Sequence, residues 1–401
     1  MNMIARISIL LFVVILLPDI YIYRRHLCRR ALPPLWQRVL WWVPCWALLI
    51  GTAAMCSVRG FAPTDQRWLG LYLVAVTVLA VPKAVFAMCS LVGRGVAWAL
   101  RSRRNYGVAV GTVLSVVTAA AAVYGFTLGT RQLVVRHVDI SLDGLPPAFE
   151  GYRIVQLSDI HAGTLPEGLL GRAVDSVNAA RADAVMFTGD LQNMEPSELT
   201  SCSADLRRLR GRDGVFAVLG NHDYSMYVSA SAAVCADNER RLREAERGFG
   251  WRLLANAHSV VRRGSDSIVV AGTENDGRPP FPSRADYGRA LDGVGHGTFV
   301  VMMQHDPWAW ETSVLPRTSA ALTLSGHTHG GQMSVMGWRP TMLVDREDCG
   351  LYRRGGRALY VSSGLGGFAP FRLNMPPEVV VITLHARHCG HAADAGLERD
   401  R

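Results

Sequence analysis

The sequence predicts an α/β protein that carries an N-terminal four-helix transmembrane region. Three observations support this fold class: a change of composition near residue 131, long apolar segments before it, and short β-branched runs alternating with amphipathic stretches after it. Leu, Val, Ala and Trp dominate the first third of the 401 residues, whereas the remainder has the mixed composition of a soluble domain. We therefore expect a transmembrane region at 1–130, a folded domain at 131–388 and a polar C-terminal tail at 389–401.

Four apolar segments are candidates for membrane-spanning helices, at residues 4–23, 39–58, 69–92 and 106–128. Each is long enough, because about 20 apolar residues in a helix cross a hydrocarbon core of about 30 Å. Asp19 follows the first apolar run and no convincing cleavage site is evident, so we expect this segment to be retained. Lys83, beside Pro82, either pairs with an acid such as Asp19 or snorkels next to the proline, and we favour snorkelling.

The distribution of arginines predicts how the spans are oriented. The loops after the first and third spans are rich in arginine, namely Arg24, Arg25, Arg29, Arg30 and Arg38, and Arg94, Arg101, Arg103 and Arg104. The opposite side carries only Arg6, Arg59 and Arg67, with Asp65. Because positively charged short loops stay in the cytoplasm, we expect the domain after residue 131 to lie on the extracytoplasmic side.

Charge and cysteine usage exclude some other classes of protein. The formal net charge is +9, but much of the excess is arginine beside the apolar segments, which is typical of a membrane protein. Neither zinc-finger spacing nor a Gly-rich phosphate loop is present, so we expect no nucleic-acid partner. The soluble part contains no CxxC pair, and its four cysteines are compatible with disulfides or with buried thiols: Cys202, Cys235, Cys349 and Cys389.

Polar residues follow five predicted strands of the soluble part, at residues 152–157, 184–187, 215–219, 298–303 and 320–324. A helix is predicted at 167–180, between the first two strands. The blocks that follow the strands contain Asp159 and His161, Asp190, Asn221 and His222, His305, and His327 and His329. These residue types are ligands that suit Mn, Fe or Zn. A single block of this kind is common in loops, so the prediction of a metal site depends on their conjunction.

The ordered series Asp-x-His, Gly-Asp, Gly-Asn-His-Asp, His and Gly-His-x-His resembles the calcineurin-like metallophosphoesterase superfamily over about residues 150–385. The resemblance implies a layered α-β-β-α metallophosphoesterase sandwich after the transmembrane region. It also implies that one metal is held by Asp159, His161, Asp190 and His329, and the other by Asp190, Asn221, His305 and His327. His222 matches the catalytic histidine of the family. Gly350-Leu351-Tyr352 and the stretch 360–366 resemble the branch that contains bacterial membrane-associated members.

The implied reaction is hydrolysis of a phosphomonoester, phosphodiester or pyrophosphate by a hydroxide held between two divalent metal ions. Mn is the favoured metal, with Fe or Zn as alternatives. Such ions, about 3.5–4 Å apart, polarise phosphoryl oxygens and acidify a shared water. Asp223 and Asp306 are candidates to orient the histidines, with turn or N-cap roles equally plausible. Three arginines are candidates for a second phosphate, although exposed arginines are usually solvated: Arg353, Arg354 and Arg372.

The membrane anchor makes a lipid-linked phosphate an attractive substrate, and we expect a multi-pass protein of the bacterial inner membrane. The alternative substrate is a UDP-diacylglucosamine-type lipid precursor cleaved at its pyrophosphate, but such a nucleotide would be cytoplasmic and so conflicts with the predicted orientation. A non-catalytic metal-binding membrane sensor or scaffold is a further alternative, against which the complete ligand set argues. A transporter has thin support, from Lys83 and only four spans.

Overall fold

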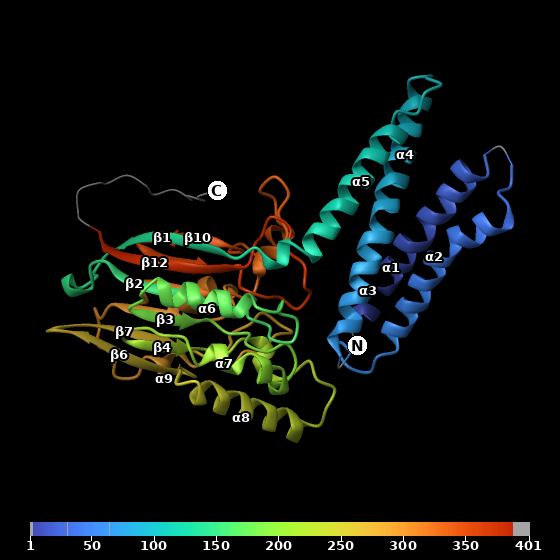
Figure 1. Ribbon diagram of the computed structural model, residues 1–401. Coiled ribbons are helices and arrows are strands. Elements are labelled where there is room, and N and C mark those ends of the chain that lie inside the picture. Colours follow the sequence, from blue (N-terminus) through green and yellow to red (C-terminus); the bar gives the residue numbers. More distant parts are fainter. Residues whose placement is uncertain (1–2, 30, 64, 388–401) are drawn as a thin grey trace. The chain divides into compact units, whose positions relative to one another are not determined.

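The computed structural model describes residues 3–29, 31–63 and 65–387 (Figure 1). The chain forms two compact units, which are Met1–Leu128 with Tyr227–Ser229, and Gly129–Met226 with Ala230–Arg401. We call them the membrane unit and the catalytic unit. The expected C-terminal tail at 389–401, with Cys389, lies outside the described residues, and so does Arg30.

The membrane unit consists of helices joined by short non-helical segments. Its helices are α1 (Met3–Ile22), continued by the π-helix η1 (Tyr23–Leu27), α2 (Leu35–Cys56), α3 (Gln66–Leu79), α4 (Val81–Ala99) and α5 (Gly107–Phe126). Within the described residues, four helical segments are long and apolar enough to cross a membrane: Met3–Leu27, Leu35–Cys56, Gln66–Ala99 and Gly107–Arg131. The prediction of four spans is therefore confirmed.

The third span is interrupted at Ala80, where α3 ends and α4 begins. Pro82 explains the break, because its ring removes an amide donor and clashes with the preceding turn. Lys83 Nζ donates to both carboxylate oxygens of Asp19, at 2.8 and 3.0 Å, and lies over the ring of Trp41. The snorkelling that we favoured for Lys83 is therefore wrong: the ammonium pairs across helices with a carboxylate that is itself buried.

Within its described residues the catalytic unit contains two six-stranded mixed sheets, with strand orders β1-β12-β2-β3-β4-β5 and β10-β11-β9-β8-β7-β6. The strands of the first sheet are β1 (Val134–Leu142), β12 (Glu378–Ala386), β2 (Tyr152–Leu157), β3 (Ala184–Phe187), β4 (Gly214–Ala217) and β5 (Arg252–Leu253). Those of the second are β10 (Gly350–Arg354), β11 (Arg357–Val361), β9 (Leu322–Ser325), β8 (Val300–Met303), β7 (Asp266–Gly272) and β6 (Ala257–Arg263).

The two sheets pack face to face, with helices on both outer faces (Figure 1). Ile154, Met186 and Phe216 of the first sheet share one buried cluster with Val301 and Leu324 of the second. The outer face of the first sheet packs against α6 (Leu169–Ala179), α7 (Ser203–Leu206) and α8 (Ala232–Gly248). The outer face of the second packs against α9 (Tyr287–Ala290) and the π-helix η6 (Trp310–Val314). The layered α-β-β-α sandwich is therefore confirmed.

The register of the parallel strands places the polar blocks at one edge. β2, β3 and β4 are parallel neighbours in the first sheet, and β8 and β9 are parallel neighbours in the second. The carboxyl ends of parallel neighbours meet at the same edge of a sheet, where loops carry the functional side chains. All five predicted strands are present, and the helix predicted at 167–180 is α6.

Candidate metal centre

The structure brings together the polar side chains that follow the five strands. Asp159, Asp190 and His305 are buried, whereas His327 and His329 retain partial exposure. Three overlapping groups have ligand atoms within 4.8 Å of one another: Asp159, His161 and His329; His161, Asp190 and His222; and Asp190, His305 and His327. Because each group shares a residue with the next, the predicted residues form one continuous cluster. This cluster is exposed to solvent at His327 and His329.

The backbone is strained at most of these positions. Five residues of the cluster have a positive φ, namely Asp159 (51°), His161 (49°), Asp190 (58°), His327 (72°) and His329 (52°). Residues other than glycine rarely adopt this left-handed backbone conformation, which costs of the order of 1 kcal/mol or more per residue. Strain of this kind persists where the surrounding structure fixes a residue for function. Its concentration here therefore marks a functional site.

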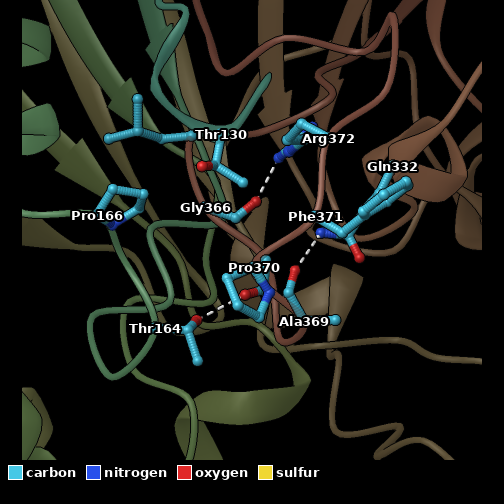
Figure 2. Close-up of a pocket in the computed structure, with 11 residues that line it drawn as sticks. Thr130, Thr164, Pro166, Gln332, Gly366, Ala369, Pro370, Phe371 and Arg372 are labelled. Carbon is cyan, nitrogen blue, oxygen red and sulfur yellow. Dashed lines mark hydrogen bonds between the residues drawn. The ribbon is translucent and has the colours of Figure 1, made fainter. Parts of the chain in front are cut away.

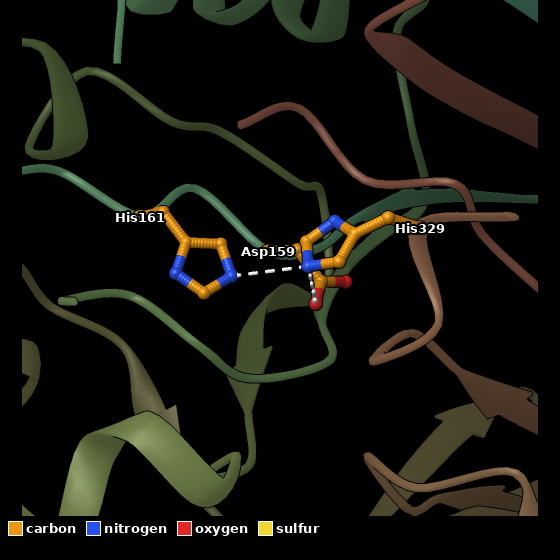
Figure 3. A group of neighbouring side chains, drawn as sticks. All are labelled: Asp159, His161 and His329. Atoms are coloured by element: carbon orange, nitrogen blue, oxygen red, sulfur yellow. Dashed lines mark hydrogen bonds and ion pairs between the residues drawn. The ribbon is translucent and has the colours of Figure 1, made fainter. Parts of the chain in front are cut away.

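The first group lies between the ends of β2 and β9 (Figure 3). His161 Nε2 lies 3.2 Å from His329 Nε2, and His329 Nε2 lies 3.6 Å from Asp159 Oδ1. His161 Nδ1 is 2.5 Å from Asn193 Oδ1, and the amide of Asn193 donates to Thr164 Oγ1, which orients its oxygen toward the ring. His161 therefore donates from Nδ1 and presents its Nε2 lone pair to the centre of the group.

Asp190 lies between the two halves of the cluster. Its Oδ2 is 3.6 Å from His161 Nε2 and 3.2 Å from His305 Nε2. Its Oδ1 accepts the backbone N–H of His222 at 2.8 Å. One carboxylate oxygen thus faces an imidazole from each half, which is the arrangement that a bridging ligand requires.

The second half of the cluster contains His305, His327 and Asn221. His305 Nδ1 lies 2.7 Å from the carbonyl of Thr188, which can only accept, so Nδ1 keeps its proton and Nε2 is the nitrogen that can lose one to a cation. His327 Nδ1 lies 2.7 Å from Asn221 Oδ1. The backbone N–H of His327 donates to Asp159, at 3.0 Å to Oδ1, which joins the two strand-end loops.

Burial and neighbouring charges set the ionisation of the cluster. Burial lowers the pKa of His161 to about 3 and also lowers the pKa of His329 and His222, so these imidazoles are neutral near pH 7. Burial opposes ionisation of Asp190, but the neighbouring His305 and His222 hold its pKa well below the usual range. Neutral nitrogens around a carboxylate that stays ionised are a donor set for a cation.

The residues present fit divalent metal ions. His305 Nε2 and His329 Nδ1 are buried and make no hydrogen bond to any described residue, although His305 Nε2 lies close to Asp190. Burial lowers the pKa of His305, but Asp190 and Asp159 outweigh it and raise the pKa to about 10. A proton at that nitrogen occupies the place that a cation would take between the same two groups, since metal binding displaces protons from its ligands.

Two glycines allow the loops to approach these carboxylates. A Cβ on Gly220 would lie 2.2 Å from Asp190 Oδ1, and a Cβ on Gly326 would lie 2.2 Å from Asp159 Oδ2. Both distances are far below contact, so no larger residue fits without displacing a carboxylate. These glycines precede Asn221 and His327 and thereby set how closely the ligands can gather.

His222 is held by Asn193, a residue that our sequence reasoning missed. His222 Nδ1 donates to the backbone carbonyl of Asn193 at 2.7 Å, while the side chain of Asn193 holds His161. Glu198 fixes the loop by accepting the backbone N–H groups of Asn193 at 2.6 Å and Met194 at 2.9 Å. The available signal was the amide pair that directly follows Gly189-Asp190-Leu191 in the sequence.

The carboxylates of Asp223 and Asp306 accept backbone N–H groups of the loops, and Asp306 also lies near a histidine. Asp223 accepts the backbone N–H groups of Asp190 and Gly220 at 2.8 Å each, and that of Leu191 at 2.9 Å. It therefore holds the loops that follow β3 and β4 in register. Asp306 Oδ1 accepts the N–H of Trp308 at 3.0 Å, and its Oδ2 lies 3.7 Å from His327 Nε2.

The three candidate phosphate-binding arginines lie in different surroundings. Arg353 and Arg354 are exposed, and Arg354 pairs with Glu311 at 2.7 Å. Arg372 is fully buried, and its guanidinium donates to the carbonyls of Gly364, Gly366 and Met375. Figure 2 shows the contact with Gly366. Because Gly366 in turn donates to the carbonyl of Asp159 at 2.7 Å, Arg372 braces the loop behind a metal-ligand candidate.

Two of the histidines outside the motif series have partners away from the cluster. His258 Nδ1 contacts the carbonyl of Ala290, and His385 lies on the surface beside Glu150 and Asp139. The seven cysteines among the described residues are free thiols.

A cavity of about 310 Å³ lies beside the segment 344–347, and none of the eight clustered residues lines it. Trp308, Arg278 and Arg346 line it together with Glu311, Asp345 and Glu347. Phe281 stacks edge-on against His327 with ring centroids 4.8 Å apart, and Phe368 lies 5.8 Å from His222. Aromatic rings thus border the cluster at His327 and at His222.

Each of the two units matches a known protein family. The family described as "Probable Calcineurin-like phosphoesterase, transmembrane domain" matches residues 5–130, and the family described as "Calcineurin-like phosphoesterase" matches residues 152–331. The second match contains each of the eight clustered residues, from Asp159 to His329.

Individual relatives match across both units or within the catalytic unit. A "Transmembrane protein with metallophosphoesterase domain" of Danio rerio is 31% identical over 414 residues, covering 94% of this chain and 89% of the relative. The "Uncharacterized metallophosphoesterase YkuE" of Bacillus subtilis is 28% identical over 254 residues, covering 60% and 81%. The "UDP-2,3-diacylglucosamine pyrophosphatase LpxG" of Chlamydia trachomatis is 27% identical over 335 residues, covering 69% and 98%.

Proposed function

The chain belongs to the calcineurin-like metallophosphoesterases that carry a four-helix transmembrane region, and from this premise we propose that it hydrolyses a lipid-linked phosphate ester or anhydride. Membership of the family makes it a membrane-bound phosphate ester hydrolase that uses divalent metal ions. The finer statements concern the role of each residue, the metal, the substrate and the compartment.

We assign the first cation to Asp159, His161, Asp190 and His329, and the second to Asp190, Asn221, His305 and His327. The observation that carries this assignment is the position of Asp190 Oδ2, within 3.6 Å of His161 Nε2 and 3.2 Å of His305 Nε2. When bound, the cations supply polarisation of the phosphoryl oxygens and a water of lowered pKa. The protein contributes the strained, hydrogen-bonded backbone that keeps these donors converged. Mn is our preferred metal, because the mixed carboxylate, amide and imidazole set suits it.

His222 acts as the catalytic residue that contacts the substrate. Since its Nδ1 is committed to the carbonyl of Asn193, any proton that the ring gains or donates is carried on Nε2. That nitrogen can protonate the leaving oxygen or stabilise charge on the phosphoryl group. His222 itself is buried, and its ring lies beside that of His161, with centroids 4.8 Å apart, inside the cluster that a substrate phosphate would reach.

The compartment follows from the arginine-rich loops. We propose that the chain is a protein of the bacterial inner membrane and that these loops face the cytoplasm. They lie between the first and second spans and between the third and fourth. The catalytic unit is then on the extracytoplasmic side. Alkaline phosphatase and β-galactosidase fused after the last span test this orientation. We expect activity from the phosphatase fusion only, and activity from the galactosidase fusion alone would reverse the assignment.

A UDP-diacylglucosamine-type pyrophosphate is the second candidate substrate, favoured by the similarity to the LpxG pyrophosphatases. That nucleotide is made in the cytoplasm, so this candidate requires the opposite orientation. The fusion experiment therefore also separates the two substrate proposals.

The reaction itself is tested with purified full-length protein and Mn²⁺. Hydrolysis is measured on p-nitrophenyl phosphate, bis-p-nitrophenyl phosphate, a polyprenyl pyrophosphate and UDP-diacylglucosamine, with His222→Ala as the matched control. We expect the polyprenyl pyrophosphate to be cleaved with the highest kcat/KM, and expect each activity to depend on His222. Preference for a water-soluble monoester would contradict the lipid-linked proposal without contradicting the reaction class.

A further inference from the structure

The catalytic unit carries a cluster of exposed apolar side chains on one short segment, residues 335–344, which we call the apolar loop. In the part of this unit that the structure describes, nine large apolar side chains are exposed, and five of them belong to the apolar loop: Val335, Met336, Trp338, Leu343 and Val344. The other four, Val135, Met226, Val234 and Val260, are scattered along the chain, and each is less than half exposed. Contiguous exposed apolar surface of this kind marks an interaction site.

The apolar loop has a defined conformation that holds these side chains outward. Val335 and Trp338 exchange backbone hydrogen bonds at 2.9 and 3.0 Å, and Met336 and Gly337 both have a positive φ, of 51° and 83°. Two adjacent positive φ values are typical of a tight hairpin turn. Met336, at the tip of this turn, is fully exposed.

The base of the apolar loop is fixed to the catalytic unit by Asp348. Arg339 binds the two oxygens of Asp348 at 2.6 and 2.9 Å, and Thr341 donates to the same carboxylate at 3.0 Å. Arg339 is the only ionisable residue within 335–344, and this pairing neutralises it. The apolar loop thus presents apolar side chains without a free charge.

The apolar loop also lies directly beside the metal centre. It follows His329 by only a few residues, and a Cβ on Gly331 would meet Pro340 Cδ at 3.2 Å and Thr341 at 3.3 Å. Thr328, between His327 and His329, donates to the carbonyl of Asp348. Whatever the apolar loop contacts is consequently brought to the rim of the site.

We propose that the apolar loop is a membrane-contacting element, inserted into the surface of the lipid bilayer that holds the spans. The membrane unit ends at Leu128, the catalytic unit begins at Gly129 and β1 begins at Val134, so the chain passes from the last span to the first strand within a few residues. A domain on so short a tether stays near a bilayer, and an uncharged patch with a tryptophan suits the interface between headgroups and acyl chains. This contact brings the metal centre to the membrane surface, where a lipid-linked phosphate, as proposed above, is presented.

The test places a photoreactive residue at the tip of the apolar loop. Full-length protein with Met336→p-benzoylphenylalanine is reconstituted into phosphatidylcholine liposomes, with and without phosphatidylglycerol, and irradiated. We expect a lipid adduct identified by mass, with a yield that does not depend on phosphatidylglycerol, because the apolar loop has no free charge. Val260→p-benzoylphenylalanine, on β6, is the matched control, and we expect at least tenfold less lipid adduct from it.

Other occupants give distinct products. A cross-linked dimer in place of a lipid adduct would show that a second copy covers the apolar loop, and equal lipid adducts at 336 and 260 would show only non-specific proximity; either result overturns the proposal. Hydrolysis of bis-p-nitrophenyl phosphate by each variant verifies folding, and Leu343→p-benzoylphenylalanine provides a second position. Since lipid adducts are scored without turnover of a lipid substrate, their absence is distinguishable from failure of the proposed function.

Discussion

Both units of the chain bury charged groups, but they compensate the charge differently. In the membrane unit the carboxylate of Asp19 meets the ammonium of Lys83 at 2.8 and 3.0 Å, and both residues lie within helices. In the catalytic unit Asp159 and Asp190 face imidazoles, on a backbone with positive φ and with buried nitrogens that lack a hydrogen bond. A buried charge alone is therefore a poor sign of chemistry, whereas a surplus of converging lone pairs on a strained backbone is a good one.

The first prediction, with the largest expected effect, concerns the carboxylate of Asp190, which lies between the two halves of the cluster. Asp190→Asn keeps the size of the side chain but removes the charge that both halves of the cluster share. Because metal ions contribute several kcal/mol to phosphoryl transfer, we expect hydrolysis of bis-p-nitrophenyl phosphate to fall by at least about 10⁴-fold. Asp266→Asn, at a surface carboxylate on β7, is the control and should retain activity. Residual activity above about a tenth would remove Asp190 from the site.

The second prediction separates proton transfer from metal binding. His222→Ala should lower kcat by about 10²–10⁴-fold, the usual contribution of a general acid or base, while metal content stays at the wild-type level. A substrate with a leaving group of low pKa needs no protonation, so its hydrolysis should be affected least. Loss of a metal ion from this variant would instead make His222 a ligand, as its place beside His161 and Asp190 allows.

The third prediction concerns Asn193, which holds a proposed ligand with its side chain and the catalytic histidine with its carbonyl. Asn193→Ala should lower kcat by about 10–100-fold and weaken Mn²⁺ binding by a similar factor, since residues behind metal ligands have effects of this size. Asn193→Asp, which keeps an acceptor for His161, should restore most of both. An equal loss in the two variants would indicate a general folding defect.

The smallest effect on catalysis is expected from changes to the ion pair of Lys83 with Asp19 in the membrane unit. Lys83→Met leaves Asp19 buried without a partner, which typically costs about 3–5 kcal/mol, so the thermal stability in detergent should fall. The double variant Lys83→Met with Asp19→Leu should recover stability, because apolar residues replace the whole pair. We expect kcat on a water-soluble diester to change less than about twofold in both, because the pair belongs to the membrane unit and shares no partner with the metal-site cluster. A large loss of kcat would show that this pair belongs to the reaction.

The sequence was sufficient for those parts of the structure that depend on local pattern. Apolar length specified the four spans, and the strands at 152–157 and 184–187 were correctly bounded, because a buried parallel strand reads as a continuous apolar run. The polar blocks were expected to gather because each follows a buried strand and parallel neighbours end at one edge, whereas the separate roles of the eight candidate residues came from the family resemblance and stay predictions.

Features that depend on which elements face each other were not predictable. The partner of Lys83 is separated from it by 64 positions, and only the packing of α1 against α4 selects Asp19. Asn193 has partners from two other strand ends, and Arg372 is buried because three backbone carbonyls surround it. No periodicity in the sequence signals such contacts. The pairing of β1 with β12, from opposite ends of the catalytic unit, is non-local for the same reason.

The central claim is that the surplus donors of the catalytic unit hold two divalent cations. The most direct measurement is the metal content of purified full-length protein by inductively coupled plasma mass spectrometry, with Asp190→Asn measured beside it. We predict two divalent transition-metal ions per wild-type chain and fewer than one per variant chain. An active wild-type protein without bound transition metal, or a variant that retains both ions, would contradict the account.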